Sequence, residues 1–169
     1  MNIRALLCSA AASVVLGAAG PMTNPSQPAP TAAPMADMQV VNGLAAVKWG
    51  PAHPALPPGA QTALMAGDPA GTGFVSIRAK MPAGYKVPPH FHPTDEHVTV
   101  LSGTMAFGMG DMIDAKSAKT VNRGGYFAAP ANMHHYAMAK TAAVIQIDFM
   151  GPFGITYVNP GDDPRHPEK

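Results

Sequence analysis

The chain has 169 residues and a formal net charge of +1; 12% of its residues are charged and 47% are hydrophobic. Such a length fits one domain, because domains typically span about 100–200 residues. Without a charge excess or a run of Lys and Arg, binding to nucleic acid or to an anionic membrane surface is not expected. No apolar run is long enough for a membrane-spanning helix. The 17 glycines and 19 prolines disfavour a helical bundle and favour a turn-rich, all-β domain.

The N-terminal segment has the features of an export signal. Arg4 supplies a positive charge, residues 5–19 form an uncharged and mostly apolar run, and small residues lie at the end of that run. This order is typical of a secretory signal peptide. We therefore predict a signal over residues 1–19, with cleavage after Ala19 and a periplasmic or secreted location. An N-terminal helix of the fold is the alternative interpretation.

Beyond the signal, the chain divides into a linker, a domain and a tail. Residues 20–36 are rich in proline and poor in large apolar side chains, which predicts an extended linker. The domain is predicted over residues 37–160, followed by a C-terminal tail over 161–169. The single cysteine, Cys8, lies within the signal. A mature chain would therefore contain no thiol, which excludes disulfides, thiolate catalysis and zinc–thiolate sites from it.

Short candidate strands, separated by turn residues, fill the predicted domain. Apolar runs alternate with Gly, Pro, Asn and Asp, at a spacing of about 8–12 residues that is typical of an antiparallel sandwich or barrel. In chain order, the predicted strands span residues 61–66, 73–80, 97–101, 104–109, 120–122, 126–128, 134–139, 142–148 and 155–158. The expected fold class is therefore all-β.

Most of the seven histidines lie in two short windows, which packing alone does not explain because histidine is only an intermediate core residue. His90 and His92 are two residues apart, so on a strand they would point to the same face and could share one ion. Prolines on both sides stiffen the backbone of this pair. His53 and His166 stand apart, among prolines and charged residues, and are expected at the solvated surface.

Two adjacent pairs, Glu96-His97 and His134-His135, offer one further candidate ligand each. Neighbours on a strand face opposite sides of a sheet. The apolar residue Val98 shares its side with Glu96, so alternation favours Glu96 inside and His97 outside. For the second pair, alternation does not decide between His134 and His135.

These residues resemble the two sequence motifs of the cupin superfamily. The spacing Gly84-x5-His90-x-His92-x3-Glu96-x6-Gly103 resembles the first motif at every fixed position, and Gly124-x5-Pro130-x-Asn132-x2-His135 resembles the second. Asn132 replaces a glycine of the family pattern, which is a mild change because Asn tolerates the left-handed backbone conformation. Ala139 stands where the family often has Asn, which affects a structural hydrogen bond.

The resemblance implies a cupin-type double-stranded β-helix, a single jelly-roll barrel with one divalent metal ion near its axis. The implied ligands are His90, His92 and Glu96 from the first motif and His135 from the second. Three imidazoles and a carboxylate suit Mn, Fe, Co, Ni, Cu or Zn and leave one or two positions open for water, substrate or dioxygen. A metal-free cupin that uses the same histidines for binding or packing is the alternative.

Three functions fit this resemblance, and one of them is a purely structural or storage role like that of the seed-storage cupins. The first is an exported metal-dependent enzyme, dioxygenase-like or hydrolytic, that acts on a small organic substrate; the alternative is a metal-binding or small-molecule-binding and sensing cupin without catalysis. The sequence identifies no second catalytic group, and the roles of His97 and His134 stay open. An exposed edge strand over residues 155–158 would favour pairing with a second copy, so a homodimer is a further expectation. The predicted pocket wall is apolar and comprises Val98, Val100, Met105, Phe107, Phe127 and Ile145.

Overall fold

The described part of the chain is built almost entirely of β-strands. A computed structural model describes residues 39–166; the signal and linker predicted over residues 1–36 lie outside the described residues. The strands are β1 (Gly50–Pro51), β2 (Gln61–Ala66), β3 (Phe74–Met81), β4 (Lys86–Phe91), β5 (Glu96–Ser102), β6 (Thr104–Met109), β7 (Lys119–Asn122), β8 (Tyr126–Ala129), β9 (His135–Ala139), β10 (Ala143–Met150) and β11 (Thr156–Tyr157). Two 3-10 turns, η1 (Leu44–Ala46) and η2 (Pro160–Asp162), flank them.

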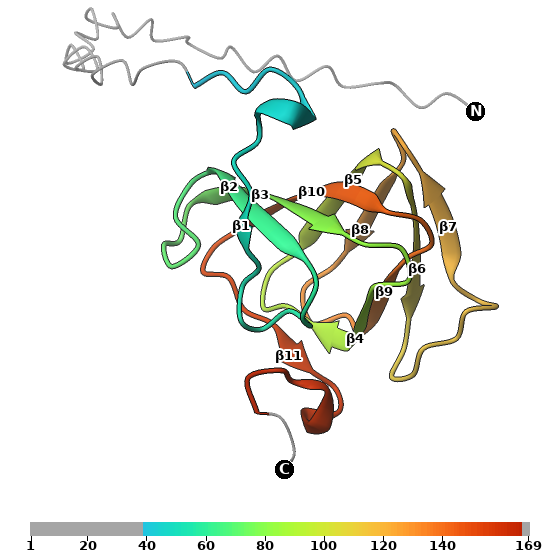
Figure 1. The fold of residues 1–169 in the computed structure, drawn as a ribbon. Coiled ribbons are helices and arrows are strands. Elements are labelled where there is room, and N and C mark those ends of the chain that lie inside the picture. The colour runs from blue at the N-terminus through green and yellow to red at the C-terminus, as the bar shows by residue number, and fades with distance from the viewer. Residues whose placement is uncertain (1–38, 167–169) are drawn as a thin grey trace, which may run out of the picture. The chain divides into compact units, whose positions relative to one another are not determined.

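These strands form two antiparallel sheets that face each other in a cupin-like sandwich (Figure 1). One sheet has the order β1-β2-β3-β10-β5-β8 and the other the order β11-β4-β9-β6-β7. Residues 39–166 contain no α-helix, so none of them belongs to a helix that could cross a membrane. The predicted all-β jelly-roll class, with a single domain, is confirmed.

The predicted strands are all present, with ends shifted by a residue or two, and residues 61–66 and 104–109 match β2 and β6. The structure adds β1 and β4. β4 contains Pro88 and Pro89, and proline cannot donate to a strand ladder. The pairing of β4 with β9 accordingly shifts register between Val87 and His90. These prolines explain why the sequence pattern did not predict β4, although β4 still pairs with β9 at His90.

The core lies between the two sheets. Val98 and Val100 of β5 are each 1% exposed, which confirms the inward side that alternation predicts for this strand. Met105 of β6 is fully buried, and Phe107 follows on the same side. The edge strand predicted near the C-terminus is β11, which pairs with β4 and so lies beside the first histidine window.

Candidate metal centre

The fold brings the predicted ligands together from separate segments. His90 at the end of β4 lies directly opposite His135 at the start of β9, and His92 follows β4. One ring nitrogen of each of these three histidines lies within 4.8 Å of the others, and all three residues are buried. Glu96 begins β5, in the facing sheet. The cluster is therefore held between the two sheets.

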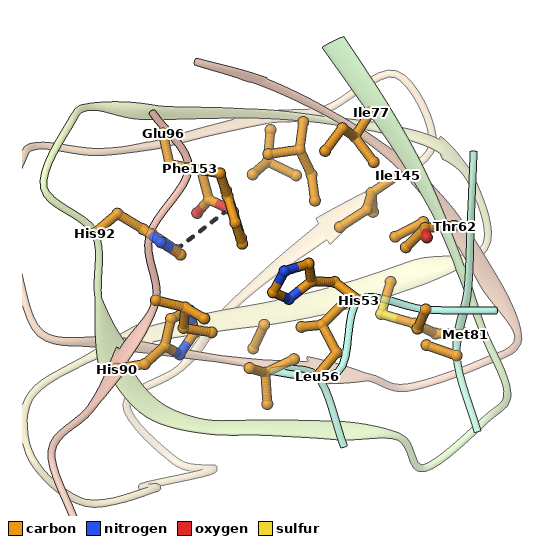
Figure 2. A pocket seen from close by; sticks show the side chains of 18 of the residues that line it. His53, Leu56, Thr62, Ile77, Met81, His90, His92, Glu96, Ile145 and Phe153 are labelled. Atoms are coloured by element: carbon orange, nitrogen blue, oxygen red, sulfur yellow. Dashed lines mark ion pairs between the residues drawn. The ribbon is translucent and has the colours of Figure 1, made fainter. Parts of the chain in front are cut away.

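Glu96 points at the histidines, as alternation along β5 predicts. Its Oε2 lies 3.3 Å from Nε2 of His135, and its Oε1 lies 3.7 Å from Nε2 of His92. Figure 2 marks the contact between His92 and Glu96 at one side of the cavity. His97, the next residue, is exposed and contacts the Tyr126 hydroxyl instead. The carboxylate of Glu96 thus completes a cluster of three imidazoles and one acid.

Backbone carbonyls orient all three imidazole rings. Nδ1 of each ring meets a carbonyl oxygen, and because a carbonyl only accepts, Nδ1 must carry the donated proton. The lone pair of each neutral ring is then on Nε2, which is the arrangement typical of metal-ligating histidines. The accepting carbonyls, for His90, His92 and His135 in turn, are those of Pro88 at 2.6 Å, Gly154 at 2.6 Å and Met133 at 2.9 Å.

The unpaired atoms of the cluster fit a bound cation. Nε2 of His92 and Nε2 of His135 are buried and have no hydrogen-bond partner, since their contacts with Glu96 lack hydrogen-bond geometry. Leaving a buried polar atom unsatisfied costs about 1–3 kcal/mol. A divalent ion would satisfy these lone pairs, and imidazole and carboxylate donors suit the first-row transition metals. The clustered, buried histidines are therefore consistent with a metal site.

Burial and mutual proximity shift the protonation of the cluster. Burial, together with the neighbouring His135 and His92, lowers the pKa of His90 to about 3. Burial opposes ionisation of Glu96, but contact with His135 and the charge of His92 outweigh it and lower the pKa of this carboxyl. Burial likewise opposes protonation of His135, and the Glu96 carboxylate overcomes it and raises the pKa. The proximity of Glu96 and His135 therefore favours the charged form of each group, and a bound cation would compete with a proton for Nε2 of His135.

A cavity of about 540 Å³ adjoins the cluster and is lined mainly by apolar side chains. In Figure 2, Ile77, Ile145 and Met81 lie across the cavity from His90 and His92. The predicted wall is correct for Val98, Phe107 and Ile145. The prediction is wrong for Val100, Met105 and Phe127, which do not line the cavity and lie in or against the hydrophobic core. The alternation of side chains along a strand shows which of them face inward, but not where between the sheets a cavity lies.

The structure shows which residue of the His134-His135 pair faces the cluster. His135 is 2% exposed and faces the cluster, whereas the His134 side chain is 40% exposed and its Nδ1 lies 2.6 Å from Asp111 Oδ1. Asn132, in the turn before them, has a φ of 62°, which confirms the left-handed conformation expected where the family has glycine. Its backbone N–H donates to the carbonyl of His92 at 2.8 Å and so joins the two motifs.

Sequence reasoning did not find the fourth cavity histidine, His53. His53 is exposed, as expected, and so is His166, but His53 also lines the cavity. No local pattern marks it, because its position depends on where the loop over residues 52–60 packs.

Three solved structures share this architecture. The polyketide cyclase RemF from Streptomyces resistomycificus has a TM-score of 0.60 at 18% identity, over 77% of this chain and 95% of that chain. A proposed acetylacetone dioxygenase from Methylibium petroleiphilum has a TM-score of 0.56 at 23% identity, over 77% and 90%. An RmlC-like cupin protein from Desulfovibrio desulfuricans has a TM-score of 0.51 at 21% identity, over 68% and 97%. At these identities the likeness shows the fold alone.

The sequence comparisons add a family. No curated protein sequence matches the chain. The family described as Domain of unknown function (DUF4437) matches residues 22–156, which is most of the chain and includes both histidine windows. The chain therefore belongs to the DUF4437 family, and its fold is that of the cupin superfamily.

Proposed function

We propose that this protein is a metal-dependent enzyme that holds one divalent ion with His90, His92, Glu96 and His135 and acts on a small organic substrate. One observation carries the proposal. Three imidazoles, with their Nε2 lone pairs turned inward, and one carboxylate meet beside an apolar cavity of about 540 Å³. Cavities of about 300–1,000 Å³ with a few convergent polar groups are typical of small-molecule sites.

Each part of the chain has a distinct task in this proposal. The three rings bind through Nε2, and the carbonyls at Nδ1 keep each ring in the correct tautomer and orientation. Glu96 contributes a negative charge that offsets part of the charge of the cation. The apolar wall binds the hydrocarbon part of a substrate and excludes water. When bound, a divalent ion in an open-sided site supplies Lewis-acid, hydroxide or dioxygen-binding chemistry.

The reaction class proposed is dioxygenase-like or hydrolytic. The similar structures include a polyketide cyclase and a proposed acetylacetone dioxygenase, so this fold serves more than one chemistry. What supports an organic substrate is the character of the wall, in which Ile77, Ile145 and Phe149 line the cavity.

Metal analysis of purified protein tests the ligand set. Because a His92→Ala variant loses one of four donors, we expect its metal content per chain to fall at least about tenfold, with the β-rich circular dichroism unchanged. His97→Ala is the matched control, since His97 follows Glu96 in β5 but is exposed. Unchanged metal in folded His92→Ala, or equal loss in His97→Ala, would exclude the assigned set.

Activity is tested with the metal-loaded protein in an oxygen electrode and in a parallel hydrolysis screen. The substrates to offer are small aromatic and keto compounds. We expect the wild-type protein to turn over at least one of these substrates. The His92→Ala variant should show no turnover, and the His97→Ala variant should match the wild-type rate. Tight binding without turnover would instead identify the protein as a binding or sensing cupin.

A further inference from the structure

His53 brings a fourth imidazole to the cavity, from the loop over residues 52–60 that joins β1 to β2. Figure 2 shows its ring projecting into the cavity, between the side of His90 and the side of Met81. The centroid of the His53 ring lies 5.4 Å from that of Phe153, in an edge-on contact, and the Phe153 centroid lies 5.7 Å from that of His92. His53 therefore borders the same phenyl ring as the metal cluster.

Two tyrosine hydroxyls hold this loop in place. The Tyr85 hydroxyl donates to the carbonyl of Pro57 at 2.6 Å, and the Tyr157 hydroxyl donates to the carbonyl of Ala55 at 2.7 Å. Ala55 is fully buried, and the backbone N–H of Leu56 closes a turn onto the carbonyl of His53 at 2.8 Å. The direction of the His53 side chain is thus set by the packed loop.

The proton of His53 lies on the opposite nitrogen from that of the clustered histidines. The backbone N–H of Ala55 donates to Nδ1 of His53 at 3.2 Å. Because an amide N–H only donates, Nδ1 presents its lone pair, and a neutral ring then carries its proton on Nε2. Partial burial of the ring, with the nearby Arg165 charge, lowers the pKa of His53 and favours the neutral ring. His53 therefore offers an N–H donor where the clustered rings offer lone pairs.

Other polar side chains of the cavity already have partners. The Thr62 hydroxyl donates to the carbonyl of Pro51 at 3.1 Å, and the Tyr85 hydroxyl is bound to the loop. Within residues 39–166, no Lys or Arg lines the cavity and Nε2 of His53 has no hydrogen-bond partner. Among the described lining residues, no Lys or Arg side chain would thus pair with an anionic group away from the cluster, and one unused donor lies there.

We propose that Nε2–H of His53 donates a hydrogen bond to an oxygen of the substrate, and that the substrate is an uncharged, mostly hydrocarbon molecule with a second oxygen function at the metal cluster. This inference rests on the proposed function, because the second oxygen function meets the metal ion. A substrate without the first oxygen would leave the donor unpaired, so His53 also discriminates among apolar molecules of one shape.

Paired probes of nearly equal size test this contact on zinc-loaded protein, since zinc has no redox chemistry. The probes are 1-(methoxyphenyl)butane-1,3-diones, with the methoxy group in the para or meta position, and the corresponding ethylphenyl compounds. The diketone binds the metal, and only the methoxy group has an acceptor oxygen. By titration calorimetry, we expect wild-type protein to bind at least one methoxy compound about fivefold more tightly than its ethyl partner, which is the effect of one net hydrogen bond.

Substitutions at residue 53 separate the hydrogen bond from ring packing. His53→Phe keeps a ring against Phe153 and should lose the preference, while His53→Gln keeps an N–H donor and should retain it. His166→Phe is the matched control, because His166 is exposed and does not line the cavity. An equal preference in wild type and His53→Phe overturns the contact, and zinc-loaded protein that binds neither compound overturns the substrate class. A wild-type protein that retains no zinc overturns the proposed function instead, and zinc content is measured before each titration.

Discussion

The four histidines of the cavity are of two kinds, because the backbone group at Nδ1 is a carbonyl oxygen for three of them and an amide N–H for the fourth. Carbonyl oxygens at His90, His92 and His135 place the ring proton outward and leave Nε2 as a donor to metal. An amide N–H at His53 reverses that placement. The identity of a side chain therefore defines its chemistry only together with the hydrogen bond that fixes its tautomer.

Acid should destabilise the metal-free protein through His90. Its folded pKa of about 3 lies below the ordinary 6.5, so between these values the unfolded chain binds a proton that the folded chain does not. The stability conferred by keeping His90 neutral is complete above about pH 6.5 and is lost as the pH falls toward 3. We expect the free energy of unfolding of chelator-treated protein, from urea titrations at pH 7.5 to 4, to fall by a few kcal/mol, on the order of 1.4 kcal/mol per pKa unit.

His90→Gln tests the origin of this effect. Glutamine does not titrate, so the free energy of unfolding of the variant should fall less steeply between pH 7.5 and 4. The remaining loss at the acid end of this range would come from protonation of Glu96, whose pKa is lowered in the folded state. His135 acts with the opposite sign, because its raised pKa adds stability at low pH that fades as the pH rises. Identical slopes in wild type and His90→Gln would assign the acid sensitivity to other groups.

Strand β4 carries His90, and the loop over residues 52–60 carries His53. The two prolines of β4 interrupt its ladder with β9, yet pairing resumes where His90 faces His135. The loop has no ladder of its own and is held by the hydroxyls of Tyr85 and Tyr157. One element is therefore positioned by register and the other by two side-chain hydrogen bonds.

Removing one hydroxyl should loosen the loop without unfolding the sheets. Tyr157→Phe leaves the carbonyl of the fully buried Ala55 without its donor, at a cost of about 1–3 kcal/mol. We expect faster amide hydrogen exchange over residues 52–60 and unchanged exchange in β5 and β10. Tyr126→Phe is the control, since Tyr126 is exposed and its hydroxyl contacts His97 outside the cavity. Equal exchange in the two variants would remove Tyr157 as a support of the loop.

Considered as one molecule, the protein is a sandwich whose two sheets each contribute to one site. His90 and His135 come from one sheet and Glu96 from the other, so the cluster forms only when both sheets are packed together. Metal bound there would link the sheets and should stabilise the folded state, because the unfolded chain holds no such site.

The predicted export signal concerns the chain as a whole. If residues 1–19 are a signal, the mature protein begins at Gly20 and is recovered from the periplasm or the medium. Cell fractionation followed by intact-mass measurement and N-terminal sequencing checks both points. A deletion of residues 2–19 should keep the protein in the cytoplasm. A full-length chain beginning at Met1 in the cytoplasm would contradict the prediction.

Local patterns in the sequence were sufficient for all strands except β1 and β4, for the two cupin motifs and for the inward side of β5. These are properties with a period of two residues or a fixed spacing, and they depend on near neighbours in the chain. Tertiary structure alone decided between His134 and His135, set the limits of the cavity wall and brought His53 into it. Those outcomes depend on contacts between distant segments, such as the bond from Tyr157 to Ala55 across 102 residues, which no local pattern encodes.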